Sequence, residues 1–158
     1  MPSGVRHDSP QKPAPPPVVV GVDGSEESKD ALRWAVDYAE LAGARVRAVI
    51  AWRWPLAPAV ALPFADVLDP EAEALNTLNT AIAEALGDRP SASVRAEACY
   101  GAAVPVLVEQ SARASLLVVG SRGRGEFAGL LLGSTSEHCL RHAPCPVAVI
   151  RAGKHPRD

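Results

Sequence analysis

The chain has 158 residues, with 16 lysines and arginines against 18 aspartates and glutamates and a formal net charge of −2. This length suits one domain with a core of its own, and the charge balance predicts no basic surface for nucleic acid. Three cysteines indicate reduced thiols, no apolar run reaches the ~20 residues of a membrane span, and the N-terminus lacks a signal-peptide core. We therefore expect a soluble, cytoplasmic protein that binds neither nucleic acid nor membrane.

The first predicted elements follow a proline-rich head. Residues 1–17 are rich in proline and poor in apolar side chains, which predicts a disordered tail. Residues 18–22 are β-branched and predict a short strand that ends in a turn at Asp23. Ser25 is a good helix N-cap, and apolar residues then recur on a broad helical face until Gly43. A second strand is expected over residues 46–51.

A long connection, residues 52–69, separates the second strand from the next helix. Its prolines at 55, 58 and 63 forbid a continuous helix, and a loop of this length is typical of a lid or a contact surface. Trp52, Trp54 and Phe64 either anchor this loop to the core or cover a ligand or a partner surface.

The second half of the chain continues to alternate helices with strands. Asp69 and Pro70 cap and open a helix that runs to Gly87. The next expected elements are a less buried strand at 94–100, a helix at 104–113, a buried strand at 116–119, a helix at 134–141 and a last strand at 147–150. This order predicts an α/β fold with a parallel sheet and helices on both faces.

Glycines and hydroxyl side chains follow the buried strand at 116–119. Gly120 and Gly123 come directly after it, and Gly133 precedes the hydroxyl run 134–136 at the start of a helix. Glycine permits positive φ and close approach to main-chain N–H groups, and a helix N-terminus adds unpaired donors. This combination predicts a cradle for phosphate.

The spacing of these glycines carries a family resemblance. Gly120, two residues, Gly123, nine residues and then Gly133 with Ser134 is the nucleotide pattern of the universal stress protein family, and the chain resembles the ATP-binding branch of that family from about 18 to 151. VVVGVDGSEES at 18–28 and HAPCPVAVIR at 142–151 flank the pattern in the family order. The resemblance implies one domain over 18–152 with tails at 1–17 and 153–158. It also implies a doubly wound, Rossmann-like sheet of five strands in the order 3-2-1-4-5.

The resemblance further implies that ATP, with Mg²⁺, binds where the first and fourth strands end, at the point where strand order reverses. Asp23 would help to hold the nucleoside, Ala51 would border the adenine, and Arg122 would border the sugar or phosphates. Two positions depart from the family pattern: Ser115 stands where aspartate is frequent, and Ile50 where histidine is common. The matched positions are Asp23, Ala51, Gly120, Arg122, Gly123, Gly133, Ser134, Thr135 and Ser136.

Other site chemistries match the sequence less well. Gly123, Gly125 and Ala128 fit a dinucleotide fingerprint, but they lie late in the chain and no acid follows at the required distance. The Walker pattern of P-loop proteins is absent. His138 and His142 lie near two cysteines without a zinc-site spacing, and no nucleophile, base and orienting group form a catalytic set.

We therefore expect an ATP-binding universal stress protein that acts as a nucleotide-dependent stress-response or signalling module with an unidentified protein partner. One alternative is a slow ATPase or nucleotidyl-transfer enzyme that uses the same cleft, and another is a nucleotide-free scaffold. The segment from Pro146 to Ile150 is apolar and, at the end of the strand order, would be an exposed edge that must be covered or paired. The resemblance implies a homodimer through this last strand.

Overall fold

The chain folds around a five-stranded parallel sheet, and the computed structural model describes residues 12–55, 69–90, 93–123 and 131–153. The strands lie in the order β3-β2-β1-β4-β5, which confirms the predicted order. All four pairings are parallel. The strands are β1 (Val18–Gly21), β2 (Val46–Trp52), β3 (Val94–Tyr100), β4 (Leu116–Gly120) and β5 (Val147–Ile150).

Four helices in the described segments connect the strands: α1 (Glu26–Ala42), α2 (Pro70–Leu86), α3 (Ala103–Ser111) and α4 (Ser134–His142). Ser25 caps α1, since its Oγ accepts the N–H of Ser28 at 3.2 Å, and Gly43 ends α1 in the left-handed conformation with φ 64°. Asp69 caps α2 in the same way through the N–H of Ala72, at 3.0 Å. Local capping chemistry therefore fixes these ends as predicted.

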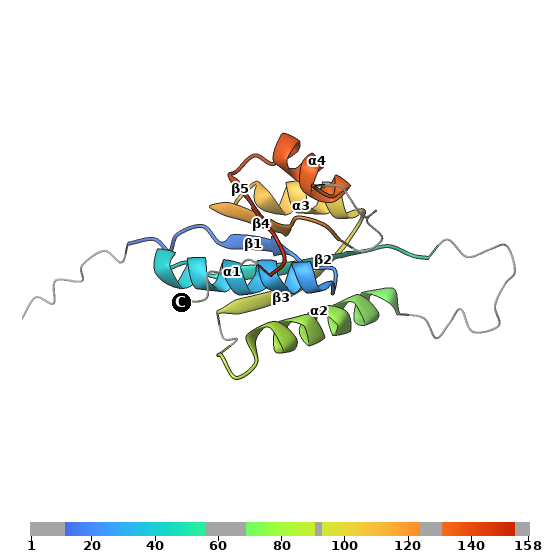
Figure 1. Cartoon of the computed structure of the whole chain (residues 1–158), viewed down its shortest axis with the longest axis horizontal. Coiled ribbons are helices and arrows are strands. Elements are labelled where there is room, and N and C mark those ends of the chain that lie inside the picture. The colour runs from blue at the N-terminus through green and yellow to red at the C-terminus, as the bar shows by residue number, and fades with distance from the viewer. Residues whose placement is uncertain (1–11, 56–68, 91–92, 124–130, 154–158) are drawn as a thin grey trace, which may run out of the picture.

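The helices cover both faces of the sheet (Figure 1): α1 and α2 pack on one face, and α3 and α4 on the other. Successive side chains of a strand point to opposite faces. Val18 and Val20 of β1 accordingly join the core under α1 and α2, while Val19 joins the core under α3 and α4. Every residue of β1 but Gly21 is therefore buried, as expected of a central parallel strand.

The outer strands are more exposed than the central ones. β3 contains no buried residue in its seven positions, which confirms the prediction that it is less deeply buried than its neighbours. All four residues of β5, at the other edge, are partly buried. β2 runs one residue further than predicted, because Trp52 still pairs with Tyr100 of β3.

The predicted tails and long loop are only partly described. Residues 12–17 have no regular structure, and the hydroxyl of Ser115 donates to the carbonyl of Pro16 at 3.0 Å. The remaining residues of the head (1–11), most of the 52–69 connection (56–68) and the last five residues (154–158) lie outside the described segments. No helix in the described segments has the length and apolar character needed to cross a membrane.

Candidate functional site

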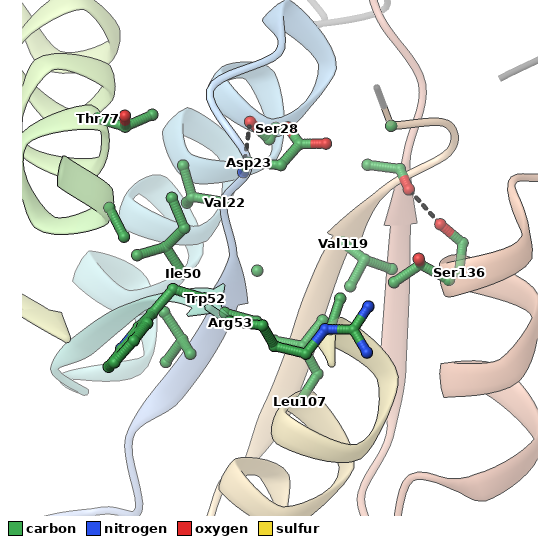
Figure 2. Close-up of a pocket in the computed structure, with 18 of the residues that line it drawn as sticks. Val22, Asp23, Ser28, Ile50, Trp52, Arg53, Thr77, Leu107, Val119 and Ser136 are labelled. Carbon is green, nitrogen blue, oxygen red and sulfur yellow. Dashed lines mark hydrogen bonds between the residues drawn. The ribbon is translucent and has the colours of Figure 1, made fainter. Parts of the chain in front are cut away.

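A cleft of about 520 Å³ opens at the carboxyl ends of β1, β2 and β4 (Figure 2). β1 and β4 are neighbours in the sheet although α1, β2, α2, β3 and α3 separate them in sequence, so the strand order reverses there. This is the place where open α/β sheets bind ligands. Seven of the nine predicted site residues line the cleft: Asp23, Ala51, Gly120, Arg122, Gly123, Thr135 and Ser136.

Asp23, which follows β1, lies against Gly123, which follows β4, at one end of the cleft. The Asp23 carboxylate accepts the backbone N–H of Ser25 at 2.9 Å and its hydroxyl at 2.5 Å, which closes the turn before α1. A Cβ on Gly123 would lie 2.8 Å from Oδ2 of Asp23, closer than real Cβ atoms come. Gly123 is therefore small because an acidic side chain lies directly against the loop.

Gly120 permits a second close approach, from the first turn of α1. A Cβ on Gly120 would lie 3.2 Å from both the carbonyl carbon and the Cβ of Glu27. The Glu27 carboxylate accepts the N–H of Arg122 at 2.6 Å, and the Nε of Arg122 lies 3.2 Å from the same carboxylate. Because the Glu27 side chain is only 15% exposed, this acid fixes both the main chain and the guanidinium of Arg122.

The predicted reason for the loop glycines was partly wrong. The positive-φ glycines of the described residues are Gly24, Gly43, Gly87, Gly101 and Gly153, so neither Gly120 nor Gly123 takes that conformation. Gly133 has φ −72° and serves as the N-cap residue of α4. Close packing against acids of the first βα unit, rather than left-handed backbone, accounts for Gly120 and Gly123.

The start of α4 forms the far wall of the cleft. Gly133 offers no side chain to cap α4, and its own N–H donates to the carbonyl of Ser121 at 2.6 Å. The hydroxyl of Ser136 donates to the carbonyl of Gly120 at 2.5 Å, which fastens the helix to the end of β4. Thr135 and Ser136 line the cleft, whereas Gly133 and Ser134 lie outside its lining.

The wall formed by β2 and α3 is mainly apolar. Val22, Ile50, Ala51, Trp52 and Leu107 line it, and Figure 2 shows Ile50 and Trp52 together on the side opposite Ser136. The ring of Trp52 meets that of Tyr100 edge-on, with centroids 5.2 Å apart. Its buried Nε1 has no hydrogen-bond partner in the described part of the chain. Ile50, which stands where the family often has histidine, thus contributes only apolar surface here.

Several lining residues were not predicted from the sequence. Arg53 follows β2, Glu73 and Thr77 come from α2, and Ser28 from α1. Arg53 was missed because residues 52–69 were interpreted as a loop, whereas β2 continues to Trp52. The α2 residues carry no local signal, because their position depends on how α2 packs across β2 and β3.

Among the described residues of the lining, two acids, Asp23 and Glu73, accompany two arginines, Arg53 and Arg122. A carboxylate and hydroxyls are oxygen ligands of the kind Mg²⁺ uses, usually one or two carboxylates together with substrate phosphates. Over the described ranges, no three His, Cys, Asp or Glu side chains gather as a metal cage. The described lining thus fits a metal that one or two carboxylates share with the phosphates of a ligand.

Comparison with known proteins places this architecture in one family. The family model described as "Universal stress protein family" matches residues 16–151. A universal stress protein of Mycobacterium tuberculosis (strain ATCC 25618 / H37Rv) is 37% identical over an alignment of 145 residues that covers 84% of this chain and 46% of that protein. One from Mycobacterium bovis is 36% identical over 140 residues, covering 85% and 48%. The chain thus spans about half the length of these relatives.

Solved structures agree with the sequence comparison. A universal stress protein from Lactobacillus plantarum superposes with a TM-score of 0.70 at 24% identity, covering 89% of this chain and all of that one. Another, solved in complex with cAMP, has a TM-score of 0.59 at 29% identity and covers 86% and 97%. The glycine spacing, the reversal of strand order beside it and these matches lead to one conclusion: the chain belongs to the universal stress protein family.

Proposed function

We propose that the cleft binds an adenine nucleotide, and specifically ATP accompanied by Mg²⁺. The observation that carries this proposal is a cleft with one apolar wall and one wall of loop and helix-terminus main chain, located where strand order reverses. A flat base suits the first wall and phosphate the second. The relative in complex with cAMP, at 29% identity, supports an adenine ligand.

Each predicted residue has a role in this proposal. Ala51, with Ile50 and Trp52, borders the adenine, and the Asp23 carboxylate accepts a hydrogen bond from the nucleoside. Gly120 and Gly123 keep the loop thin, and Arg122, fixed by Glu27, shapes the loop beside the phosphates. At the start of α4, the first-turn N–H groups of Ser134, Thr135 and Ser136 and the hydroxyls of Ser134 and Thr135 are offered to the phosphates and the metal, and Gly133 fixes the start of the helix through its bond to Ser121.

The direct experiment is nucleotide analysis of the protein purified without added ligand. Denaturation is expected to release ATP in a near-stoichiometric amount, which mass spectrometry detects. Calorimetry of nucleotide-stripped protein is expected to show ATP binding. A protein that releases no nucleotide and binds neither ATP, AMP nor cAMP in calorimetry would be a nucleotide-free scaffold, and the proposal would be withdrawn.

The bound ATP is proposed to be held rather than consumed. Phosphoryl transfer needs a positioned water and stabilisation of the transition-state charge. Glu137, at the start of α4, forms a salt bridge with Arg141, with 2.8 Å between the charged groups. Its side chain is half exposed and does not line the cleft. Glu126 lies outside the described residues. Turnover with Mg²⁺ is expected to be far below the ~10 s⁻¹ typical of enzymes, and turnover at enzyme-like rates would favour the ATPase alternative.

We further propose that the protein is a cytoplasmic homodimer that acts as a stress-response or signalling module. β5 lies at the edge of the sheet with its outer side unpaired within the described chain, which supports pairing with a second copy. Cys99, Cys139 and Cys145 are all free thiols, which suits a reducing compartment. The output of the module would be a contact with another protein that depends on the nucleotide state.

A further inference from the structure

The two arginines that line the cleft within the described segments, Arg53 and Arg122, are not equally available to a ligand. Arg122 is held by the Glu27 carboxylate through both its backbone N–H and its Nε. Arg53 also lines the cleft, but no hydrogen bond or ion pair joins its guanidinium to any other residue in the described segments. Arg122 is therefore paired directly with Glu27, while the guanidinium of Arg53 forms no ion pair within the described segments and can contact a ligand in the cleft.

The alternation of β2 places Arg53 on the face of the sheet that carries α4. Ala48 and Ile50 point into the core under α1 and α2, whereas Val49 and Ala51 pack with the core under α3 and α4. Arg53 continues the second set, two residues after Ala51. The preceding carbonyl, of Trp52, accepts the N–H of Gly101 at 2.8 Å, which holds the end of β2 in place.

The side chain of Arg53 extends across the cleft on the face of the sheet given by the alternation along β2. In Figure 2 the Arg53 side chain runs from the end of β2 past Leu107 of α3, and its guanidinium is directed to the side of the cleft where Ser136 of α4 lies. Thr135 and Ser136 bring the uncapped start of α4 to the opposite wall. An anionic group in the cleft would thus lie between a helix N-terminus and a guanidinium that forms no ion pair with Asp23, Glu73 or any other acid of the described segments.

We propose that Arg53 is the side chain that recognises the phosphate charge of the bound nucleotide, and that Arg122 is not. This inference rests on the proposed nucleotide function and adds to it the residue that sets the preference among nucleotides of different phosphate number. Arg53 favours ligands of greater negative charge, because an exposed guanidinium attracts a triphosphate more strongly than a monophosphate and leaves adenosine unaffected.

The test is the affinity of nucleotide-stripped protein for adenosine, AMP, ADP and ATP, measured by calorimetry at low ionic strength. For Arg53→Gln, the preference for ATP over adenosine is expected to fall about tenfold, as for one lost charge-assisted contact, with adenosine affinity within about twofold of the starting protein. Arg53→Lys should recover part of the preference. The matched control is Arg113→Gln: Arg113 is also exposed and follows α3, outside the lining of the cleft.

The outcomes separate this inference from the function on which it rests. If the unaltered protein binds neither adenosine nor ATP, both proposals fail. If it binds the two equally, or if Arg53→Gln keeps the full preference for ATP, the nucleotide site stands and the role of Arg53 is overturned. A loss as large in Arg113→Gln, or the whole loss in Arg122→Gln instead of Arg53→Gln, would overturn it as well. Thermal unfolding of each variant checks that the fold is kept.

Discussion

Gly123 and Gly43 are glycines for opposite physical reasons. Gly43 ends α1 with φ 64°, and nothing lies within 4 Å of the place where its Cβ would be. Gly123 has no left-handed backbone, but a Cβ there would meet the Asp23 carboxylate at 2.8 Å. A methyl group added at Gly43 thus strains only the backbone, whereas one added at Gly123 displaces a side chain of the cleft.

Alanine at these two positions should therefore separate stability from binding. Gly43→Ala is expected to lower the free energy of unfolding by about 1 kcal/mol and to leave ATP affinity unchanged. Gly123→Ala is expected to weaken ATP binding at least about tenfold, because Asp23 must move, with a smaller effect on stability. Chemical denaturation and calorimetry on both variants measure the two quantities. Undiminished ATP affinity in Gly123→Ala would contradict the assignment of this loop to the nucleotide.

At the scale of elements, one polar cluster joins two strands and a helix. Arg47 of β2 donates to both carboxylate oxygens of Glu97 in β3, at 3.0 and 2.6 Å, and also to Gln110 of α3. The hydrogen bonds from Arg47 lower the pKa of Glu97 below its ordinary value of 4.5. A lowered pKa in the folded state means that the charged form stabilises the fold.

This cluster predicts a loss of stability in acid. The contribution of Glu97 is fully present above its ordinary pKa of 4.5 and is lost as the pH falls through the lower pKa of the folded state. Replacing Glu97 by glutamine should therefore lower the free energy of unfolding near neutral pH, and the difference from the unaltered protein should shrink toward zero in acid. Urea denaturation across this range measures the difference. A difference that stays constant with pH would mean that packing, not charge, is what Glu97 supplies.

The elements were largely predictable from the sequence because their ends carry local signals. Ser25, Gly43 and Asp69 act through neighbours three or four residues away, so the order and type of the elements could be read from the chain. The strand order came from the family resemblance. The contact of Glu27 with Arg122 joins residues 95 positions apart, and no local pattern reports it. Glu27 could be interpreted only as a favourable first-turn acid of α1.

Arg53 illustrates a different reason for a missed residue. The prolines after Trp54 made the whole stretch from Trp52 resemble a loop, and a loop has no alternating faces. Once Trp52 pairs with Tyr100, β2 extends to that point and its alternation continues into Arg53. Arg53 could therefore be recognised as a cleft residue only once the pairing of Trp52 with Tyr100, at the end of the β2–β3 ladder, was known.

For the whole molecule, the edge of the sheet at β5 is where the proposed homodimer would form. The carbonyls of Pro146 and Ile150 accept N–H groups of Leu117 and Ser121 at 2.9 and 2.7 Å, so these residues turn their backbone toward β4. Backbone direction alternates along a strand, which turns Val149 toward the free edge. Val149→Pro removes a donor from that edge and spares the ladder to β4.

Sedimentation should show a dimer at micromolar concentration for the unaltered protein and a monomer for Val149→Pro. Thermal unfolding of the variant, compared at the same concentration, checks that the monomer is folded. A monomeric unaltered protein, or a Val149→Pro variant that remains dimeric, would show that β5 is not the contact between copies.

α1 and α4, which lie on opposite faces of the sheet, differ in how much of each helix is buried. α1 buries six residues, Ser28, Ala31, Leu32, Ala35, Val36 and Ala39, whereas α4 buries only Ser136 and Cys139. Local unfolding requires least free energy where the least apolar surface is buried, so amide hydrogens of α4 should exchange with solvent faster than those of α1. The wall of the cleft that carries Thr135 and Ser136 is then the one that yields. A nucleotide would enter and leave through transient opening of α4, while α1 and the sheet keep their shape.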